Sequence, residues 1–363
     1  MKDSGIRLLS AALLFIFTAF IAVGDPPEPR NEPLAIPAEP TINEWLHSSR
    51  VPIVGIGLIE DGKVKEIRVF GEIRPGVPAP ANTIFNVASL TKPIVAILTL
   101  KLVSEGQWNL DEPLSKYFVD PDLAGDSRVS KITTRLVLTH ETGLPNWKGN
   151  EPSNKLSLAF DPGTNIKYSG EAFQYLRQAL EKKFNQPLDE LSASLVFRPF
   201  DMADTRHYWD KSMDESRYAG SYDKDGNPLP LEKWYEPHAA NLLLTTVGDY
   251  SKFGAHVVDG AGLSKDVYAE MVSPYSPSGK SSPSSPNPFG LCWRLIPDLS
   301  NGEYALVHSG RNPGLATIVI LLPKSKRGIV VFTNGENGDQ VYKKVIVNSL
   351  VLGQEIVDKW ERH

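Results

Sequence analysis

Ser89 and Lys92, a serine and a lysine three positions apart, have the spacing that nucleophilic chemistry requires. On an α-helix, residues at i and i+3 are neighbours on one face, so this spacing puts an amine beside a hydroxyl. A serine hydroxyl is a weak nucleophile by itself, and a neighbouring base activates it. A helix-capping serine followed by a solvated lysine would give the same letters, so the surrounding sequence has to decide between the two interpretations.

The segment after Lys92, PIVAILTLKLVSEG, leaves almost no polar face. A helix that is apolar nearly all round is buried in a protein core. Ser89 is therefore expected at the start of a core helix, where unpaired backbone N–H groups and the helix dipole favour negative charge. Pro93 fits this position, because proline is tolerated in a first helical turn.

Two later segments complete a constellation of polar groups. After turn residues at 161–163, Tyr168-Ser169-Gly170 leads into a stretch with the apolar periodicity of an amphipathic helix. Further on, a predicted strand ends at His308-Ser309-Gly310, and two more strands are expected at about 314–322 and 328–333.

These motifs resemble those of the serine β-lactamase and penicillin-binding protein family, in its branch of class C β-lactamases and esterases. The family has S-x-x-K, Y-x-N and K-T-G or H-x-G in this order, and the chain has S-L-T-K at 89–92, Y-S-G at 168–170 and H-S-G at 308–310. Connecting segments resemble the family as well, among them LTHETGLPNW, GQWNLDEPLSKYF, FRPFDMADT, NLLLTTVGDYSKF and FGLCW. The resemblance covers roughly residues 41–356.

The resemblance implies acyl transfer to water through a covalent acyl-enzyme. Ser89 Oγ would be the nucleophile, and Lys92 and Tyr168 would share the role of general base. Both side chains ordinarily titrate near pH ~10, and burial or a neighbouring charge has to lower one of them. Because two coupled groups titrate as a pair, the sequence leaves open which one accepts the proton.

The resemblance also implies a substrate site around the third motif. His308 would border the site and either assist the tyrosine or contact the leaving group. The backbone N–H groups of Ser89 and Arg311 would form the oxyanion hole, and Gly310 and Gly170 would line the substrate site.

Two departures from the family motifs bear on the substrate. Gly170 stands where the family has asparagine, so a side-chain amide that would contact an acyl-amide group is missing. His308 stands where a lysine would face a substrate carboxylate, and histidine is mostly neutral at pH ~7. Arg311 could replace that cation or be a solvated loop residue. Both departures argue against β-lactams and D-Ala-D-Ala peptides.

Three functions are therefore compared. The favoured one is a hydrolase of esters or small amides, including D-amino-acid peptides. A β-lactamase or D,D-peptidase is weakened by the residues at 170 and 308. A non-catalytic binding protein that keeps the fold is weakened by the intact Ser89, Lys92 and Tyr168.

Composition agrees with a folded enzyme that acts on a small-molecule or peptide substrate. The 363 residues, 41% hydrophobic and 22% charged, suffice for a large core. A net charge of -5 without a long basic run argues against nucleic acid as a partner. The histidines are scattered, which predicts no metal, and no cofactor motif is present. Cys292, the one cysteine, allows no internal disulfide and is expected in the core.

The N-terminus has the pattern of an export signal. A basic start, the apolar stretch LLSAALLFIFTAFIAV and small residues before Asp25 predict a signal peptide at 1–24. The alternative is an uncleaved membrane anchor, for which the apolar stretch is short of the ~20 residues of a span. A proline-rich spacer follows at 25–40. We therefore expect a periplasmic or extracellular protein of bacterial type, with membrane contact only through an uncleaved signal.

The predicted fold class is α+β. Strands are expected at 52–59 and 63–70 and again from about 289 to 333, with helices and loops between them and a closing helix from 341. This order predicts one antiparallel sheet flanked by helices. The family resemblance adds a mostly helical subdomain, inserted at about 107–270 in a catalytic domain spanning 41–356, with the site between sheet and subdomain.

Overall fold

The computed structural model describes residues 34–274 and 289–361. The predicted signal peptide and most of the predicted spacer lie outside these ranges, so both remain predictions. Within the described ranges, every helix is too short or too polar to cross a membrane.

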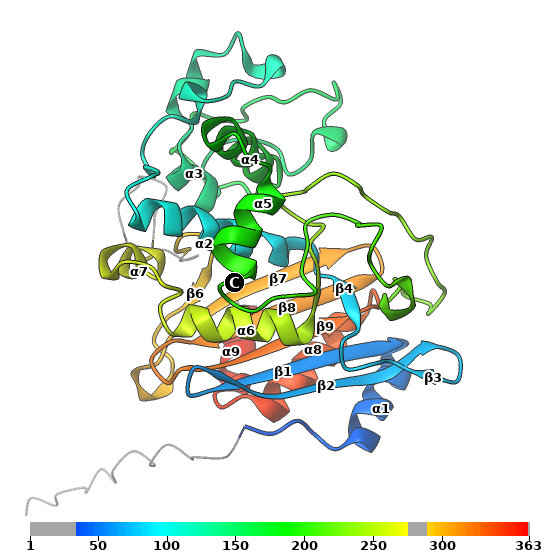
Figure 1. Cartoon of the computed structure of the whole chain (residues 1–363). Helices are drawn as coiled ribbons and strands as arrows, with labels where there is room; N and C mark the ends of the chain where they lie inside the picture. Colours follow the sequence, from blue (N-terminus) through cyan, green and yellow to red (C-terminus); the bar gives the residue numbers. More distant parts are fainter. Residues whose placement is uncertain (1–33, 275–288, 362–363) are drawn as a thin grey trace, which may run out of the picture. The chain divides into compact units, whose positions relative to one another are not determined.

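An antiparallel sheet of seven strands organises the fold (Figure 1), in the order β3-β2-β1-β9-β8-β7-β6. The strands are β1 (Ile53–Glu60), β2 (Lys63–Arg74), β3 (Val77–Pro78), β6 (Arg294–Ile296), β7 (Ala305–Asn312), β8 (Leu315–Leu322) and β9 (Arg327–Thr333). N-terminal β1 pairs directly with C-terminal β9, which joins the two ends of the chain in one sheet. The α+β class and the antiparallel sheet are confirmed.

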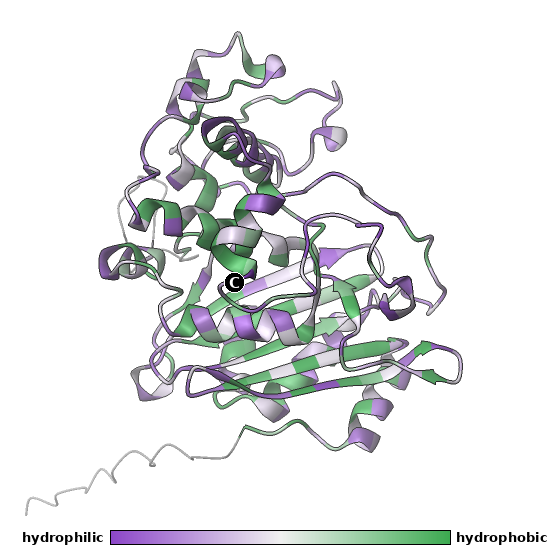
Figure 2. Ribbon diagram, viewed as in Figure 1, coloured by the Kyte–Doolittle hydropathy of each residue, from purple (hydrophilic) through white to green (hydrophobic). Residues whose placement is uncertain are grey.

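Helices cover both faces of this sheet. On one face lie α1 (Glu39–Ser49), α8 (Gly338–Ser349) and α9 (Gly353–Glu361), which is two helices where the sequence predicted one closing helix. On the other face, α6 (Val247–Val258) packs on β1, β2 and β9. The sheet is apolar throughout its centre (Figure 2), as expected for strands that are covered on both sides.

A layer of helices lies beyond the α6 face. It contains α2 (Thr91–Ser104), α3 (Thr134–Leu138), α4 (Glu171–Phe184), α5 (Leu188–Ser192) and α7 (Lys265–Met271), and α5 continues into a π-helical turn, Ala193–Phe197. A small second sheet pairs β4 (Ile84–Asn86) with β5 (Leu244–Thr246). Nearly every side chain of α2 is buried, which confirms the prediction of a core helix.

Strand β7 differs from its prediction in a way that matters for the site. It continues beyond Gly310 to Asn312, so the third motif lies inside a strand and the turn to β8 is Pro313-Gly314. Successive side chains of a strand point to opposite faces. Leu306 accordingly packs with the α2 side of the core, and Val307 packs with the α8 side.

Candidate active site

Ser89 lies in a short helical turn, Ala88–Leu90, that leads directly into α2. Ala88 has a left-handed backbone with φ 48°, and its N–H donates to Asn86 Oδ1 at 2.8 Å. The turn leaves the Ser89 side chain half-buried, while Lys92 follows in the first turn of α2. The sequence placed the helix start correctly.

Gly310 allows strand β7 to lie directly against this turn. A Cβ atom at Gly310 would lie 2.4 Å from the carbonyl oxygen of Val87 and 2.4 Å from Thr317 Oγ1. The Thr317 hydroxyl itself donates to Val87 O at 3.0 Å. Any larger residue at 310 would push the third motif away from Ser89.

The Lys92 amine is completely buried beside the Ser89 hydroxyl. Its Nζ lies 3.1 Å from Ser89 Oγ and donates to the carbonyl oxygen of Ala240 at 2.9 Å. The ring centroids of Tyr168 and Phe173 lie 4.7 and 5.6 Å from Nζ, and no carboxylate is among its partners in the described ranges. Burial therefore dominates and lowers the pKa of Lys92 from 10.5 to about 7.

Tyr168 approaches the same oxygen from the other side. Its hydroxyl donates to Ser89 Oγ at 2.8 Å. Tyr168 as a whole is 40% exposed, but desolvation around its hydroxyl raises its pKa above the usual value, and the bond to Ser89 offsets only part of this rise. At neutral pH the tyrosine is a proton donor, whereas Lys92 is partly in its neutral, proton-accepting form.

His140 holds Tyr168 in place, and sequence reasoning assigned it no role. Its carbonyl oxygen accepts from Lys167 N–H at 2.8 Å, and its Nδ1 accepts from Ser169 N–H at 3.3 Å. Its ring centroid lies 4.4 Å from that of Tyr168. Burial lowers the pKa of His140, which keeps Nδ1 available as an acceptor. The residue lies in LTHETGLPNW, a segment that the family resemblance had marked.

His308 lies on the wall of the pocket that contains Ser89. The pocket has a volume of about 350 Å³, and Tyr168 and Asn312 line it too. His308 is 8% exposed, and burial with the nearby Lys92 lowers its pKa to about 3. The side chain is therefore neutral at pH 7, so the third motif supplies no cation.

The Arg311 side chain does not supply the missing cation either. Its guanidinium donates to Glu336 O at 2.8 Å and pairs with Asp339 Oδ1 at 3.2 Å, at the start of α8. Because side chains alternate along β7, Arg311 shares the α8 face with Val307, whereas His308 and Gly310 face the Ser89 turn.

The backbone N–H of Arg311 remains well placed to be an oxyanion donor. Across the two-residue turn, Asn312 pairs with Leu315, and Arg311 is opposite Ala316. In an antiparallel pair of strands, opposite residues alternate between pairs that exchange backbone hydrogen bonds and pairs whose N–H and C=O groups point away from the partner strand. The pair next to a two-residue turn is hydrogen-bonded, so the next pair, Arg311 and Ala316, is not, and the Arg311 N–H points away from β8. Since β6 pairs with β7 only as far as Val307, this N–H lies on a free edge.

Gly170 leaves room for the ring of Trp147. A Cβ at Gly170 would lie 2.4 Å from two ring atoms of Trp147 and 2.9 Å from Asn146 O. Trp147 also lines the Ser89 pocket. The position that holds an amide in the family motif is thus closed by an indole ring in this chain.

Replacing Gly170 with asparagine is expected to destabilise the protein by roughly 1–3 kcal/mol, because the new side chain overlaps the Trp147 ring. Urea unfolding measures the loss. Gly149→Asn is the matched control, since a Cβ there meets nothing within 4 Å. Adding Trp147→Ala to Gly170→Asn should recover part of the lost free energy of unfolding. If the effects of the two substitutions on this free energy simply add, the side chains do not overlap.

Glu141, next to His140, is a buried carboxyl group that contributes to stability in a pH-dependent way. Oε2 accepts from Thr139 Oγ1 at 2.5 Å, and Oε1 has no hydrogen-bond partner among the described residues. Burial raises the pKa of Glu141 from 4.5 to about 7. The folded state thus holds the proton more tightly than the unfolded state. The stability of the fold therefore falls as the pH rises from about 4.5 through about 7, and the loss is complete above that range.

Glu141→Gln is therefore expected to stabilise the protein at pH ~8 by up to roughly 3 kcal/mol, at about 1.4 kcal/mol per pKa unit. Near pH ~4.5, where the folded state is protonated and the unfolded state is only half ionised, the gain should be small. Urea unfolding at the two pH values checks this, with the exposed Glu236→Gln as control. An equal gain at both pH values would show that ionisation is not the cause.

Comparisons with known proteins identify the family of the chain. A family model described as Beta-lactamase matches residues 38–351. "Protein flp" of Staphylococcus aureus strain MW2 is 23% identical over 317 residues, covering 81% of this chain and 61% of that protein. The D-alanyl-D-alanine-carboxypeptidase/endopeptidase AmpH of Escherichia coli K12 is 29% identical over 169 residues, covering 41% of this chain and 44% of AmpH. The chain thus spans about 61% of the length of the first of these relatives.

Solved structures share the fold. The octameric penicillin-binding protein homologue of Pyrococcus abyssi superposes with a TM-score of 0.73 at 22% identity, covering 87% of this chain and 76% of that one. A class C β-lactamase of Rhodobacter sphaeroides superposes with a TM-score of 0.69 at 16% identity, covering 85% of this chain and 98% of that one. The D-amino acid amidase of Ochrobactrum anthropi SV3, solved with L-phenylalanine, superposes with a TM-score of 0.67 at 21% identity, covering 85% of this chain and 99% of that one. Because the family model spans most of the sequence, the chain belongs to the Beta-lactamase family.

Proposed function

We propose that this β-lactamase-family serine hydrolase cleaves an ester or a small amide, including D-amino-acid peptides, through an acyl-enzyme on Ser89. One observation carries the proposal. Ser89 Oγ lies within hydrogen-bonding distance of both the buried Lys92 amine, at 3.1 Å, and the Tyr168 hydroxyl, at 2.8 Å. Three chemically complementary groups from two distant segments meet at one oxygen atom on the wall of a pocket.

In the proposed reaction, neutral Lys92 accepts the proton of Ser89 Oγ as this oxygen attacks the substrate carbonyl carbon. The backbone N–H groups of Ser89 and Arg311 stabilise the oxyanion, and one such donor is worth about 2.7–4 kcal/mol in a transition state. The Lys92 ammonium returns the proton through the Tyr168 hydroxyl to the leaving oxygen or nitrogen. Water then attacks the carbonyl carbon of the Ser89 ester, and Lys92 accepts its proton. The bond between that carbon and Ser89 Oγ breaks, Lys92 returns the proton to Oγ, and the carboxylic acid leaves.

The second candidate, a β-lactamase or D,D-peptidase, has the support of the relatives' names. The site argues against it at three points: His308 is neutral, the Arg311 guanidinium lies at α8, and Trp147 occupies the place of the motif's amide. A β-lactam brings a carboxylate and an acyl-amide that these residues leave under-paired. A non-catalytic binding protein would have no need for a lysine buried without a charge partner.

The experiment that tests the proposal compares p-nitrophenyl acetate or butyrate with a cephalosporin. Each missing partner costs about 1–3 kcal/mol, so kcat/KM for the ester is expected to exceed that for the cephalosporin by roughly 30- to 10⁴-fold. His308→Lys together with Gly170→Asn should narrow the gap, and Trp147→Ala has to be added to make room for the amide. A wild-type preference for the cephalosporin would reject the argument.

Export of the protein is a further proposal. It is supported by the N-terminal sequence pattern alone, which puts the start of the mature chain near Asp25.

A further inference from the structure

We propose that a second pocket, next to the Ser89 pocket, binds the acyl part of the substrate and selects aromatic acyl groups that carry a protonated amine. The inference rests on the proposed acyl-enzyme at Ser89. It adds the chemical class of the acyl group and the residues that recognise it.

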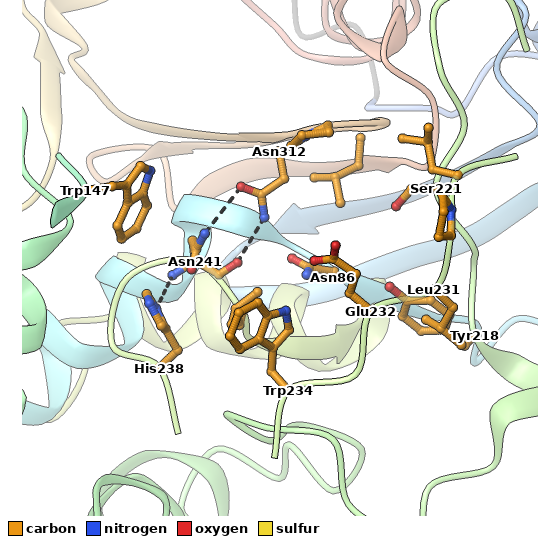
Figure 3. A pocket seen from close by; sticks show the side chains of 15 residues that line it. Asn86, Trp147, Tyr218, Ser221, Leu231, Glu232, Trp234, His238, Asn241 and Asn312 are labelled. Carbon is orange, nitrogen blue, oxygen red and sulfur yellow. Dashed lines mark hydrogen bonds between the residues drawn. The ribbon is translucent and has the colours of Figure 1, made fainter. Parts of the chain in front are cut away.

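The second pocket has a volume of about 470 Å³, within the range of small-molecule sites (Figure 3). It shares Trp147 and Asn312 with the pocket that contains Ser89. The side-chain amide of Asn312, which lines both pockets, donates to the carbonyl oxygen of Asn241, which lines the second pocket, at 3.2 Å. An acyl group bound to Ser89 can therefore extend past Trp147 into this space.

Aromatic side chains from separate segments form the walls. Trp147 lies at the end that adjoins the Ser89 pocket, Tyr218 lies at the other end, and Trp234 stands between them on a loop (Figure 3). Trp234 is 54% exposed, an unusual position for the largest apolar side chain. A flat aromatic ligand would cover its indole ring and gain the stacking that solvent does not provide.

The loop that carries Trp234 is anchored before any ligand arrives. The carbonyl oxygen of Trp234 accepts from Trp209 N–H at 2.6 Å, and Leu229 N–H donates to Ser221 O at 2.8 Å. Tyr222 N–H donates to Gly314 O at 3.2 Å, which attaches the loop to the β7–β8 turn. A preformed wall loses little conformational entropy when it binds.

The charge of the pocket comes from Glu232. Among the described lining residues it is the one carboxylate, and no lysine or arginine accompanies it. His238 is neutral, since its Nδ1 accepts N–H bonds from Ala240 and Asn241 at 3.2 Å.

Lys233, the neighbouring cation, is occupied elsewhere. Its Nζ pairs with Glu215 Oε1 at 2.5 Å and lies 4.9 Å from the centre of the Trp209 ring. No cation of the described ranges, Lys233 included, forms an ion pair with Glu232. The pocket therefore complements an ammonium group and repels a carboxylate.

Three kinds of methyl ester test this recognition, all of the form X–CH(CH₂Ph)–CO₂CH₃. X is hydrogen, an ammonium group or a carboxylate, which gives 3-phenylpropionate, phenylalanine (both enantiomers) and monomethyl benzylmalonate. Rates are measured at about pH 6, where the amine stays protonated. The readout is the ratio of kcat/KM for each charged ester to that for the uncharged one. Comparing ratios between variants cancels the intrinsic reactivity of each ester.

Glu232→Gln is expected to lower the ratio for the better phenylalanine enantiomer about two- to fivefold, and to raise the ratio for the carboxylate. Glu236→Gln is the matched control: it lies on the same loop, is exposed and does not line the pocket. Identical ratios in both variants would overturn the role of Glu232.

Trp234→Leu tests the aromatic wall, with the exposed neighbour Tyr235→Leu as its control. The preference for the phenylalanine ester over the alanine ester should fall about two- to tenfold in Trp234→Leu and stay unchanged in Tyr235→Leu. An unchanged preference in both variants would overturn the aromatic part. Failure of the acyl-enzyme proposal can be told apart from failure of the pocket proposal. If Ser89 is not the nucleophile, Ser89→Ala will hydrolyse all these esters as fast as the wild type.

Discussion

Ser89→Ala is expected to abolish hydrolysis of every substrate and to abolish covalent labelling by a fluorophosphonate probe. The variant keeps the backbone N–H groups and loses only the oxygen atom at which Lys92 and Tyr168 converge. In serine hydrolases, loss of the nucleophile lowers kcat by up to about 10⁶-fold. Mass spectrometry of the labelled protein, together with rates for a p-nitrophenyl ester, measures both effects.

The outcome is informative only if the variant folds, which circular dichroism and thermal unfolding check. Ser309→Ala is a suitable control, because Ser309 is exposed on β7 and lines the same pocket. Ser169 has a structural role instead: its hydroxyl donates to Pro145 O at 2.8 Å and accepts from Ala172 N–H at 2.9 Å. A label that persists in Ser89→Ala, or moves to Ser169 or Ser309, would contradict the assignment of the nucleophile.

Lys92→Met is expected to slow formation of the acyl-enzyme by about 10²–10⁴-fold, the range for a positioned general base. Since burial lowers the pKa of Lys92 to about 7, the wild-type acylation rate should rise as the pH increases through about 7 and then level off. The sign follows from the chemistry, because only the deprotonated amine accepts the Ser89 proton. Stopped-flow measurement of acylation across this pH range checks both the size and the direction of the effect.

Two further variants separate Lys92 from its neighbours. Lys101→Met removes another lysine of α2, away from the pocket, and should leave the pH profile unchanged. Tyr168→Phe removes a hydroxyl group whose pKa burial has raised, so it should lower the rate while the profile still rises near pH 7. If the rise moves to a different pH in Tyr168→Phe, the tyrosine belongs to the titrating base.

Local patterns in the sequence predicted the candidate nucleophile, and they determined its helix and most of the sheet. The spacing of Ser89 and Lys92, and the apolar run after them, depend on helical periodicity, which is a property of neighbouring residues. The strands β1, β2, β8 and β9 are continuous runs that periodicity and turn residues define in the same way. For this reason the antiparallel α+β fold could be predicted before any long-range contact was known.

Tertiary structure alone decided what surrounds Ser89. The register of β7 sends the Arg311 guanidinium to α8 and leaves its N–H on the free edge, and a strand that ends two residues earlier would have placed both elsewhere. Trp147 closes the gap at Gly170 because its segment is bound to the start of α4, where the N–H groups of Gly170 and Glu171 donate to Asn146 O. The pKa of Lys92 depends on burial by residues far along the chain. Strand register, the packing of Trp147 against the start of α4 and desolvation all arise from contacts between separate segments, which short-range sequence patterns do not encode.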